Sequence, residues 1–140
     1  MKKIFVLGFF IIVLFSCSID NSTPPTSHFE VLPIENVELP QFFLFGETHT
    51  ITYTFLQPTT CHFFNDLYYE IDGDTRIVAV ANSVLSGPDL NCEPLSNELI
   101  ENSFNFYVTK ETGTYTFKFW QGKDENGEDI YLIFETPVIN

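Results

Sequence analysis

Residues 113–137 read GTYTFKFWQGKDENGEDIYLIFETP, and they carry the clearest fold signal in the chain. Two runs rich in aromatic and β-branched residues, 113–121 and 130–137, flank the polar segment 123–128. That segment contains Asn126-Gly127, a pair that favours tight hairpin turns because both residues tolerate positive φ. The stretch therefore predicts a β-hairpin.

A two-residue turn at Asn126-Gly127 also predicts which residues lie opposite one another. Apolar residues then face apolar residues and a lysine faces a glutamate, which is the pattern that cross-strand energetics favour. A four-residue loop would change the partners but keep every side chain on the same face, because side chains alternate along a strand. The predicted pairs are Lys118 with Glu135, Phe119 with Phe134, Trp120 with Ile133 and Gly122 with Tyr131.

The chain before this hairpin reads as further strands. Phe, Tyr, Thr, Val and Ile dominate it, several runs alternate with period two, and no amphipathic helix pattern occurs. Asp72-Gly73-Asp74 marks a second hairpin turn, in which Gly73 supplies a positive φ. The strands expected here are 28–32, 35–39, 50–55, 63–71, 75–84 and 103–108, with a loop at 86–97.

Residues 111–117, ETGTYTF, resemble the tyrosine-corner segment of immunoglobulin-like domains. The resemblance implies that Gly113 and Tyr115 form the corner, with the Tyr115 hydroxyl bonded to the preceding loop. It places Phe117 where antibody domains have their second cysteine. It further implies an all-β, immunoglobulin-like antiparallel β-sandwich of about seven strands over residues 28–140. A lipocalin-like barrel is the alternative fold, although such barrels usually need a longer chain.

The first 17 residues combine the features of an exported bacterial lipoprotein. Lys2 and Lys3 give a basic start, and the apolar run at 4–15 is shorter than the roughly 20 residues that span a membrane. The run ends in Leu-Phe-Ser-Cys at 14–17, which resembles the lipobox of bacterial lipoproteins, with Cys17 as the lipid acceptor. The alternative is an ordinary signal peptide with a chance cysteine.

This resemblance implies where the protein resides. Residues 1–16 would be the signal peptide, and a diacylglyceryl group, with acyl chains such as palmitate, would attach Cys17 to the bilayer. Residues 17–27 are polar, contain two prolines and read as a flexible tether. The expected location is the bacterial cell envelope, with the anchor in the outer membrane and the domain facing the periplasm or the cell surface.

Two cysteines remain once Cys17 is assigned to lipid. They are Cys61 and Cys92, and an exported protein enters a compartment that permits disulfides. We therefore predict a Cys61–Cys92 disulfide, with two free thiols as the alternative. No metal site and no other cofactor is expected, because no histidine has ligand spacing with these cysteines.

The chain is strongly acidic, with a net charge of −13. All 19 acidic residues follow Cys17, so removing residues 1–16 leaves 124 residues and a net charge of −15. Nucleic acid is excluded as an expected partner, because it requires clustered Lys and Arg. Catalytic motifs such as Gly-x-Ser-x-Gly do not occur, and we predict no enzyme. The acidic turns at 72–74 and 124–129 offer oxygen ligands for Ca²⁺, although solvated turns explain them better.

The final hairpin leaves one aromatic face outside the predicted core. Alternation places Trp120, Tyr131 and Ile133 on that face, and Tyr68 joins them if the 63–71 strand neighbours the hairpin. Exposed aromatic clusters are typical of binding sites for proteins or sugars, although an ordinary cross-strand ladder is the simpler interpretation. We predict a non-enzymatic binding or adhesion domain for an unidentified protein or glycan. The alternative is a small inhibitor or immunity-type lipoprotein acting through its loops.

Overall fold

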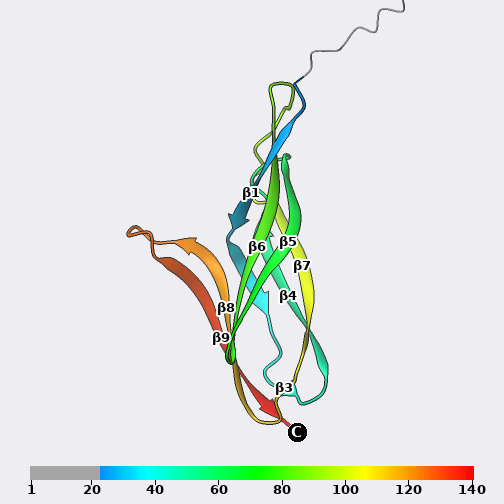
Figure 1. Cartoon of the computed structure of the whole chain (residues 1–140), viewed down its shortest axis with the longest axis vertical. Coiled ribbons are helices and arrows are strands. Elements are labelled where there is room, and N and C mark those ends of the chain that lie inside the picture. The colour runs from blue at the N-terminus through cyan, green and yellow to red at the C-terminus, as the bar shows by residue number, and fades with distance from the viewer. Residues whose placement is uncertain (1–22) are drawn as a thin grey trace, which may run out of the picture.

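The computed structural model describes residues 23–140, and within this range the chain is all-β and contains no helix. Figure 1 shows the strands arranged as a long, narrow sandwich. Every strand expected from the sequence occurs, with the short β3 in addition. No helix of the length and apolarity that a membrane span requires is present among these residues. The strands are β1 (Thr26–Leu32), β2 (Ile34–Glu38), β3 (Phe43–Leu44), β4 (Thr48–Leu56), β5 (His62–Asp72), β6 (Thr75–Ser86), β7 (Leu99–Tyr107), β8 (Gly113–Lys123) and β9 (Asp129–Ile139).

The predictions for the N-terminal segment fall largely beyond the part that the structure describes. The signal peptide at 1–16 and the lipid site at Cys17 lie outside it, as does most of the tether at 17–27. The last two tether residues already belong to β1, because Thr26 and Ser27 pair with the end of β6. The first strand thus begins two residues before the one expected at 28–32.

The strands form two separate sheets, which confirms the predicted sandwich and excludes a closed barrel. The smaller sheet has the order β2-β4-β7. The larger sheet has the order β1-β6-β8-β9-β3, with β5 pairing with β6. Most pairs are antiparallel, but β6 pairs with β8 and β3 with β9 in parallel. Since β5 occupies one edge of β6 along most of its length, β8 and β1 share the other edge in succession.

The core between the two sheets is largely aromatic. Phe106 of β7 packs edge-on against Tyr115 and Phe117 of β8, with ring centroids 4.8 and 5.1 Å apart. Phe43 of β3 packs against the same three rings. All four side chains are buried. Burying an apolar side chain of this size contributes about 1.5–3 kcal/mol, so this cluster contributes strongly to holding the two sheets together.

The final hairpin forms as predicted, but its predicted register is wrong by two residues. Trp120 pairs with Tyr131 and Lys118 with Ile133, so that Lys118 does not face Glu135. One residue of the shift arises in the loop, where Asp124 N–H donates to the Glu128 carbonyl at 2.8 Å. The other arises from a bulge between Trp120 and Gly122. Because the two shifts add to an even number, each side chain keeps its predicted face.

Gly127 and Gly122 adopt the backbone conformations that these two irregularities need. Their φ angles are 82° and 117°, in the region that favours glycine. The Asp124 carboxylate closes the loop from inside, because its Oδ1 accepts hydrogen bonds from the backbone N–H groups of Asn126 and Glu128. The loop is therefore a three-residue turn with a bulge, a type that competes with the two-residue turn expected from Asn126-Gly127.

Tyr115 occupies the corner position that the sequence resemblance implies. Its side chain is only 1% exposed, and its hydroxyl accepts a hydrogen bond from the Thr109 N–H at 3.3 Å. The Thr109 hydroxyl lies 3.2 Å from the same oxygen. Gly113, with φ 102°, lets the chain turn into β8 at this point. The bond ties β8 to the loop that follows β7, six residues upstream.

The predicted Cys61–Cys92 disulfide is present, with the two Cα atoms 5.3 Å apart. It joins the turn before β5 to the long loop between β6 and β7. Backbone bonds hold the same loop, because the Thr60 N–H donates to the Glu93 carbonyl and the Leu95 N–H to the Pro58 carbonyl. The loop is thus fixed to the end of the sandwich at several points.

Replacing Tyr115 with Phe should lower the free energy of unfolding by about 1 kcal/mol, because the Thr109 N–H then loses its part-buried acceptor. Urea denaturation of the two chains measures this difference. The matched control is Tyr107→Phe, which removes a hydroxyl from a side chain that is 57% exposed and should have little effect. Equal stability of the two variants would contradict the corner role.

Removing the disulfide by Cys61→Ala with Cys92→Ala should destabilise the chain by about 3 to 4 kcal/mol, because the bridge closes a loop of 31 residues. Chemical denaturation of the oxidised native chain and the double variant gives this value. Reduction of the native chain should reproduce most of the loss. A double variant as stable as the oxidised chain would show that the backbone bonds alone fix the loop.

Candidate functional site

Trp120 lies on the outer face of the larger sheet, as its position in β8 predicts. Phe117 and Phe119 point into the core and are fully buried, so the alternating Lys118 and Trp120 point outward. Trp120 is half-buried, and its indole Nε1–H donates to Asp129 Oδ1 at 2.9 Å. This bond fixes the ring against the start of β9.

Trp120 forms one wall of a groove with a volume of about 350 Å³. The floor comes from Ala79 and Ala81 of β6, whose small side chains leave space between larger neighbours on both sides. Tyr68 stands opposite Ala79 on β5, and Val31 stands opposite Ala81 on β1. The complete lining is Val31, Tyr68, Ile77, Ala79, Ala81, Trp120, Asp129 and Tyr131. The groove is almost entirely apolar, with Asp129 as its one charged group.

The groove lies where the larger sheet divides. The pairing of β8 with β6 extends only from Thr75 to Val78, and β1 takes over that edge of β6 at Val80. Beyond this point the β8–β9 hairpin leaves the sheet, which Figure 1 shows as the orange and red arm. The bulge next to Trp120 lies on this departing part of β8. The division of the sheet therefore opens the space that the aromatic rings line.

The structure brings three of the four predicted face residues together, by a different route from the one expected. The sequence places Tyr68 on this face if β5 neighbours the hairpin, and the structure does not meet that condition. β6 lies between them, and Tyr68 and Trp120 meet across its alanines. Tyr131 completes the set. Ile133 lies on the same face, pairs with Lys118 and is 58% exposed, but it does not line the groove.

Sequence reasoning missed the part of this surface that β1 provides. Phe29 and Val31 alternate along β1 and are 74% and 47% exposed. Phe29 pairs with Ser83, and Phe63 of β5, half-exposed, pairs with the same serine from the other side. An apolar strip thus continues from the groove along β1 and β5. The alternation in the expected strand at 28–32 carries this signal, but nothing in the sequence says which face is outside.

Two acidic side chains of the final hairpin, Asp129 and Asp124, accept hydrogen bonds from within the hairpin. The Lys123 ammonium donates to Asp129 Oδ1 at 2.8 Å, and this bond, with that from Trp120, lowers the pKa of Asp129. Hydrogen bonds from the backbone of Glu128 and Asn126 lower the pKa of Asp124. Among residues 23–140, no group of three or more His, Cys, Asp or Glu side chains is arranged to hold a metal ion.

The rim of the groove offers hydrogen-bond acceptors. The Tyr68 hydroxyl donates to the Glu70 carboxylate, and this bond raises the pKa of Tyr68. Glu70 lies on the same face as Tyr68, two residues along β5. Together with Asp129 it places a carboxylate on each side of an aromatic surface. Such a rim suits a ligand that brings hydroxyl or other donor groups to flat rings.

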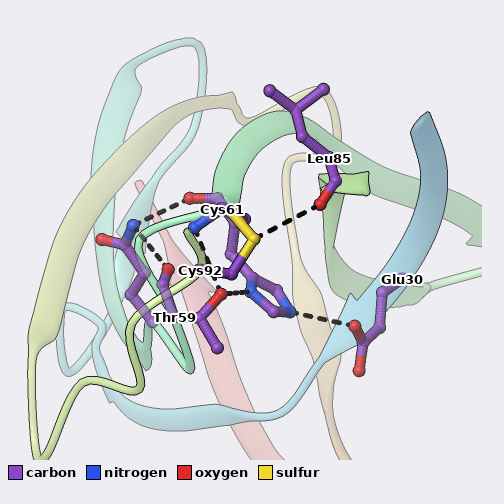
Figure 2. A network of polar contacts seen from close by, with 7 residues as sticks. Glu30, Thr59, Cys61, Leu85 and Cys92 are labelled. Carbon is purple, nitrogen blue, oxygen red and sulfur yellow. Dashed lines mark hydrogen bonds and ion pairs between the residues drawn. A yellow bond between two sulfur atoms is a disulfide. The ribbon is translucent and has the colours of Figure 1, made fainter. Parts of the chain in front are cut away.

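A polar network centred on the buried His62 lies beside the disulfide, at another part of the molecule (Figure 2). His62 is 8% exposed, with Nδ1 2.8 Å from the Thr59 hydroxyl and Nε2 3.0 Å from the Glu30 carboxylate. This order of carboxylate, imidazole and hydroxyl is that of a nucleophilic triad. Thr59 Oγ1, however, also accepts the Cys61 N–H at 3.1 Å, which closes a local turn. The network ties β1 to the turn before β5 and supports the disulfide.

Comparison with known proteins adds no information on the groove or the network. No protein-family model matches the chain, and neither a curated protein nor a solved structure matches it.

Proposed function

We propose that this chain is a membrane-anchored lipoprotein of the bacterial cell envelope whose β-sandwich binds a neutral glycan in the Trp120 groove. The observation that carries the binding role is the groove itself, in which three aromatic side chains surround a floor of alanines. The anchor rests on residues 1–17. The protein acts as a non-enzymatic display or adhesion domain.

The anchor holds the domain close to the bilayer. Eight residues separate Cys17 from β1, and a fully extended chain of that length spans at most about 29 Å. β1 starts beside the end of β6, so the tether reaches the sandwich at the end that carries the disulfide-linked loop. In Figure 1 the C-terminus lies at the opposite end. The groove faces sideways, accessible to a polymer in the envelope or outside it.

The aromatic lining is the physical reason for assigning a ligand to this groove. Tyr68 is 51% exposed although its ring is mostly apolar, and keeping such area in water is unfavourable. Tryptophan and tyrosine are also the residues that most often dominate binding energy. Flat rings accept the apolar faces of sugar rings, while Asp129 and Glu70 accept hydrogen bonds from sugar hydroxyls.

Charge selects among glycans. The carboxylates at the rim and the net charge of the mature chain repel an anionic polymer, so an uncharged one fits better.

A small inhibitor function has its own support in the loop between β6 and β7, which the disulfide and backbone bonds hold in one conformation. Preorganised loops lose little entropy on binding an enzyme or toxin.

Lipidation is tested by growing cells with an alkyne analogue of palmitate and detecting the tag on the full chain. Native chain should be labelled, and Cys17→Ala should abolish the label because the acceptor thiol is gone. The control is the double variant Cys61→Ala with Cys92→Ala, which should keep the label. Equal labelling of Cys17→Ala and native chain contradicts the anchor.

Trp120→Ala should weaken glycan binding by tenfold or more, because truncating a central aromatic anchor typically costs about 2 kcal/mol. An array of neutral plant and microbial glycans, probed with the full chain, measures the effect. The control is Tyr107→Ala, which removes an exposed aromatic side chain that lies outside the groove.

A second variant separates loss of the groove from loss of the fold. Ala79→Leu keeps every aromatic ring but fills the floor, and it should also reduce binding while the chain stays folded by circular dichroism. Binding that survives both variants would transfer the function to the loops. Capture of a protein through Trp120, with no glycan bound, would keep the groove and change the ligand class.

A further inference from the structure

A second cleft opens between the two sheets, away from the Trp120 groove. It has a volume of about 440 Å³ and lies between β5 and β7. These strands are edge strands, because β5 pairs only with β6 and β7 only with β4. The sheets therefore separate at this side. The apolar walls come from Leu67, Tyr69, Ile71, Phe104, Phe106 and Tyr107.

Arg76 lines this cleft from the inner face of β6. It is the only arginine in the chain, and its side chain is 8% exposed. Its Nη1 donates to the carbonyls of Gly73 and Thr75 at 2.8 and 3.0 Å. The guanidinium carbon lies 5.0 Å from the Tyr115 ring centroid and 5.8 Å from that of Phe106.

The charge of Arg76 is not matched within the described chain. Its Nε is buried without a hydrogen-bond acceptor, and no ion pair among residues 23–140 includes it. The nearby Asp74 pairs instead with Lys110 at 2.7 Å. Buried charges in proteins are normally paired or fully hydrogen-bonded, because an uncompensated charge is costly in a medium of low dielectric. Two carbonyls, two aromatic rings and the neutral Tyr69 hydroxyl offset part of this cost, but none of them carries a negative charge.

The residues that line the cleft indicate which other chemical groups a bound ligand needs. Tyr69 of β5 and Phe104 of β7 pack edge to face, with ring centroids 5.8 Å apart, and their contact closes one side of the cleft. Burial raises the pKa of the Tyr69 hydroxyl, while the charge of Arg76 and a hydrogen bond with its side chain oppose that rise. Apart from Arg76, the polar groups of the lining are few, and they include Asn105 and Thr109. One cation in an apolar cleft of this size matches a small molecule with one anionic group.

We propose that the cleft binds a small organic acid whose carboxylate pairs with the Arg76 guanidinium and whose apolar body packs against the side chains that line the cleft from β5 and β7. The carboxylate supplies the opposite charge that the described residues do not provide, in a charge-assisted hydrogen bond to the guanidinium. The acidic surface of the protein slows the approach of an anion, but screening at physiological salt limits this repulsion to short range. This site is independent of the Trp120 groove.

The test uses 4-phenylbutyrate as the probe and 4-phenylbutyramide as its matched neutral control. Because the chain has one arginine, its Nε–H gives a single unambiguous signal in a nitrogen–proton spectrum of the full chain. Titration with the carboxylate should move that signal downfield to saturation. The amide should bind about tenfold more weakly or not at all, because it lacks the charge.

Two variants assign the effect to this site. Arg76→Lys keeps the positive charge but loses the planar guanidinium, and should weaken carboxylate binding about tenfold or more. Ile71→Glu places a permanent carboxylate on the residue that pairs with Arg76. Since Ile71 is 65% exposed, this chain should fold, show a shifted Arg76 signal without probe, and no longer bind the carboxylate. Lys118→Met, which removes a cation from the outer face, should leave binding unchanged.

Each result of these binding experiments either supports or contradicts the proposal. Equal binding of the carboxylate and the amide overturns the proposal, as does undiminished carboxylate binding by Ile71→Glu. If Arg76→Lys fails to fold, Ile71→Glu alone decides, because it retains the arginine. Loss of binding in Lys118→Met, with no change in Ile71→Glu, would place the anion on the outer face and refute the cleft.

Discussion

Phe106 on β7 packs edge-on against Tyr115 and Phe117 on β8, and this contact orients both of the proposed binding sites. It joins the two sheets, and by drawing these side chains inward it fixes the orientation of the whole of β8. Trp120 is consequently directed outward. Arg76 lies against the same rings, so the cleft between the sheets has its cation in place because of this cluster. Both proposed sites thus share one structural support.

The central strand β6 contributes its inner face to the Arg76 cleft and its outer face to the Trp120 groove. On its inner face Val78 and Val80 are fully buried, and Arg76 precedes them near the turn at Gly73. On its outer face Ala79 and Ala81 leave room for aromatic rings from β5 and the final hairpin. β6 also provides an edge that β8 and β1 share. The division of the sheet at that edge is why a groove exists where a continuous sheet would present a flat face.

The two sites differ in the physical reason for binding. In the Trp120 groove, ligand contact removes exposed aromatic area from water, and the rim carboxylates favour an uncharged partner with hydroxyl donors. In the Arg76 cleft, an anion compensates a charge that is already buried. The end of the sandwich nearest the tether holds the disulfide and the Glu30–His62–Thr59 network. These contacts fix the long loop and the start of β1 without using either site.

Features that follow from local chemistry could be predicted from the amino-acid sequence. Alternation assigned Trp120 and Tyr131 to the outside, two cysteines allowed one pairing within the domain, and the segment around Tyr115 indicated a sandwich. Features that depend on contacts between distant segments could not be predicted in this way. Loop bonds from Asp124 and a bulge set the hairpin register, and the position of β6 decided how Tyr68 reaches Trp120. The unpaired state of Arg76 depends on what surrounds it in three dimensions, which no local pattern records.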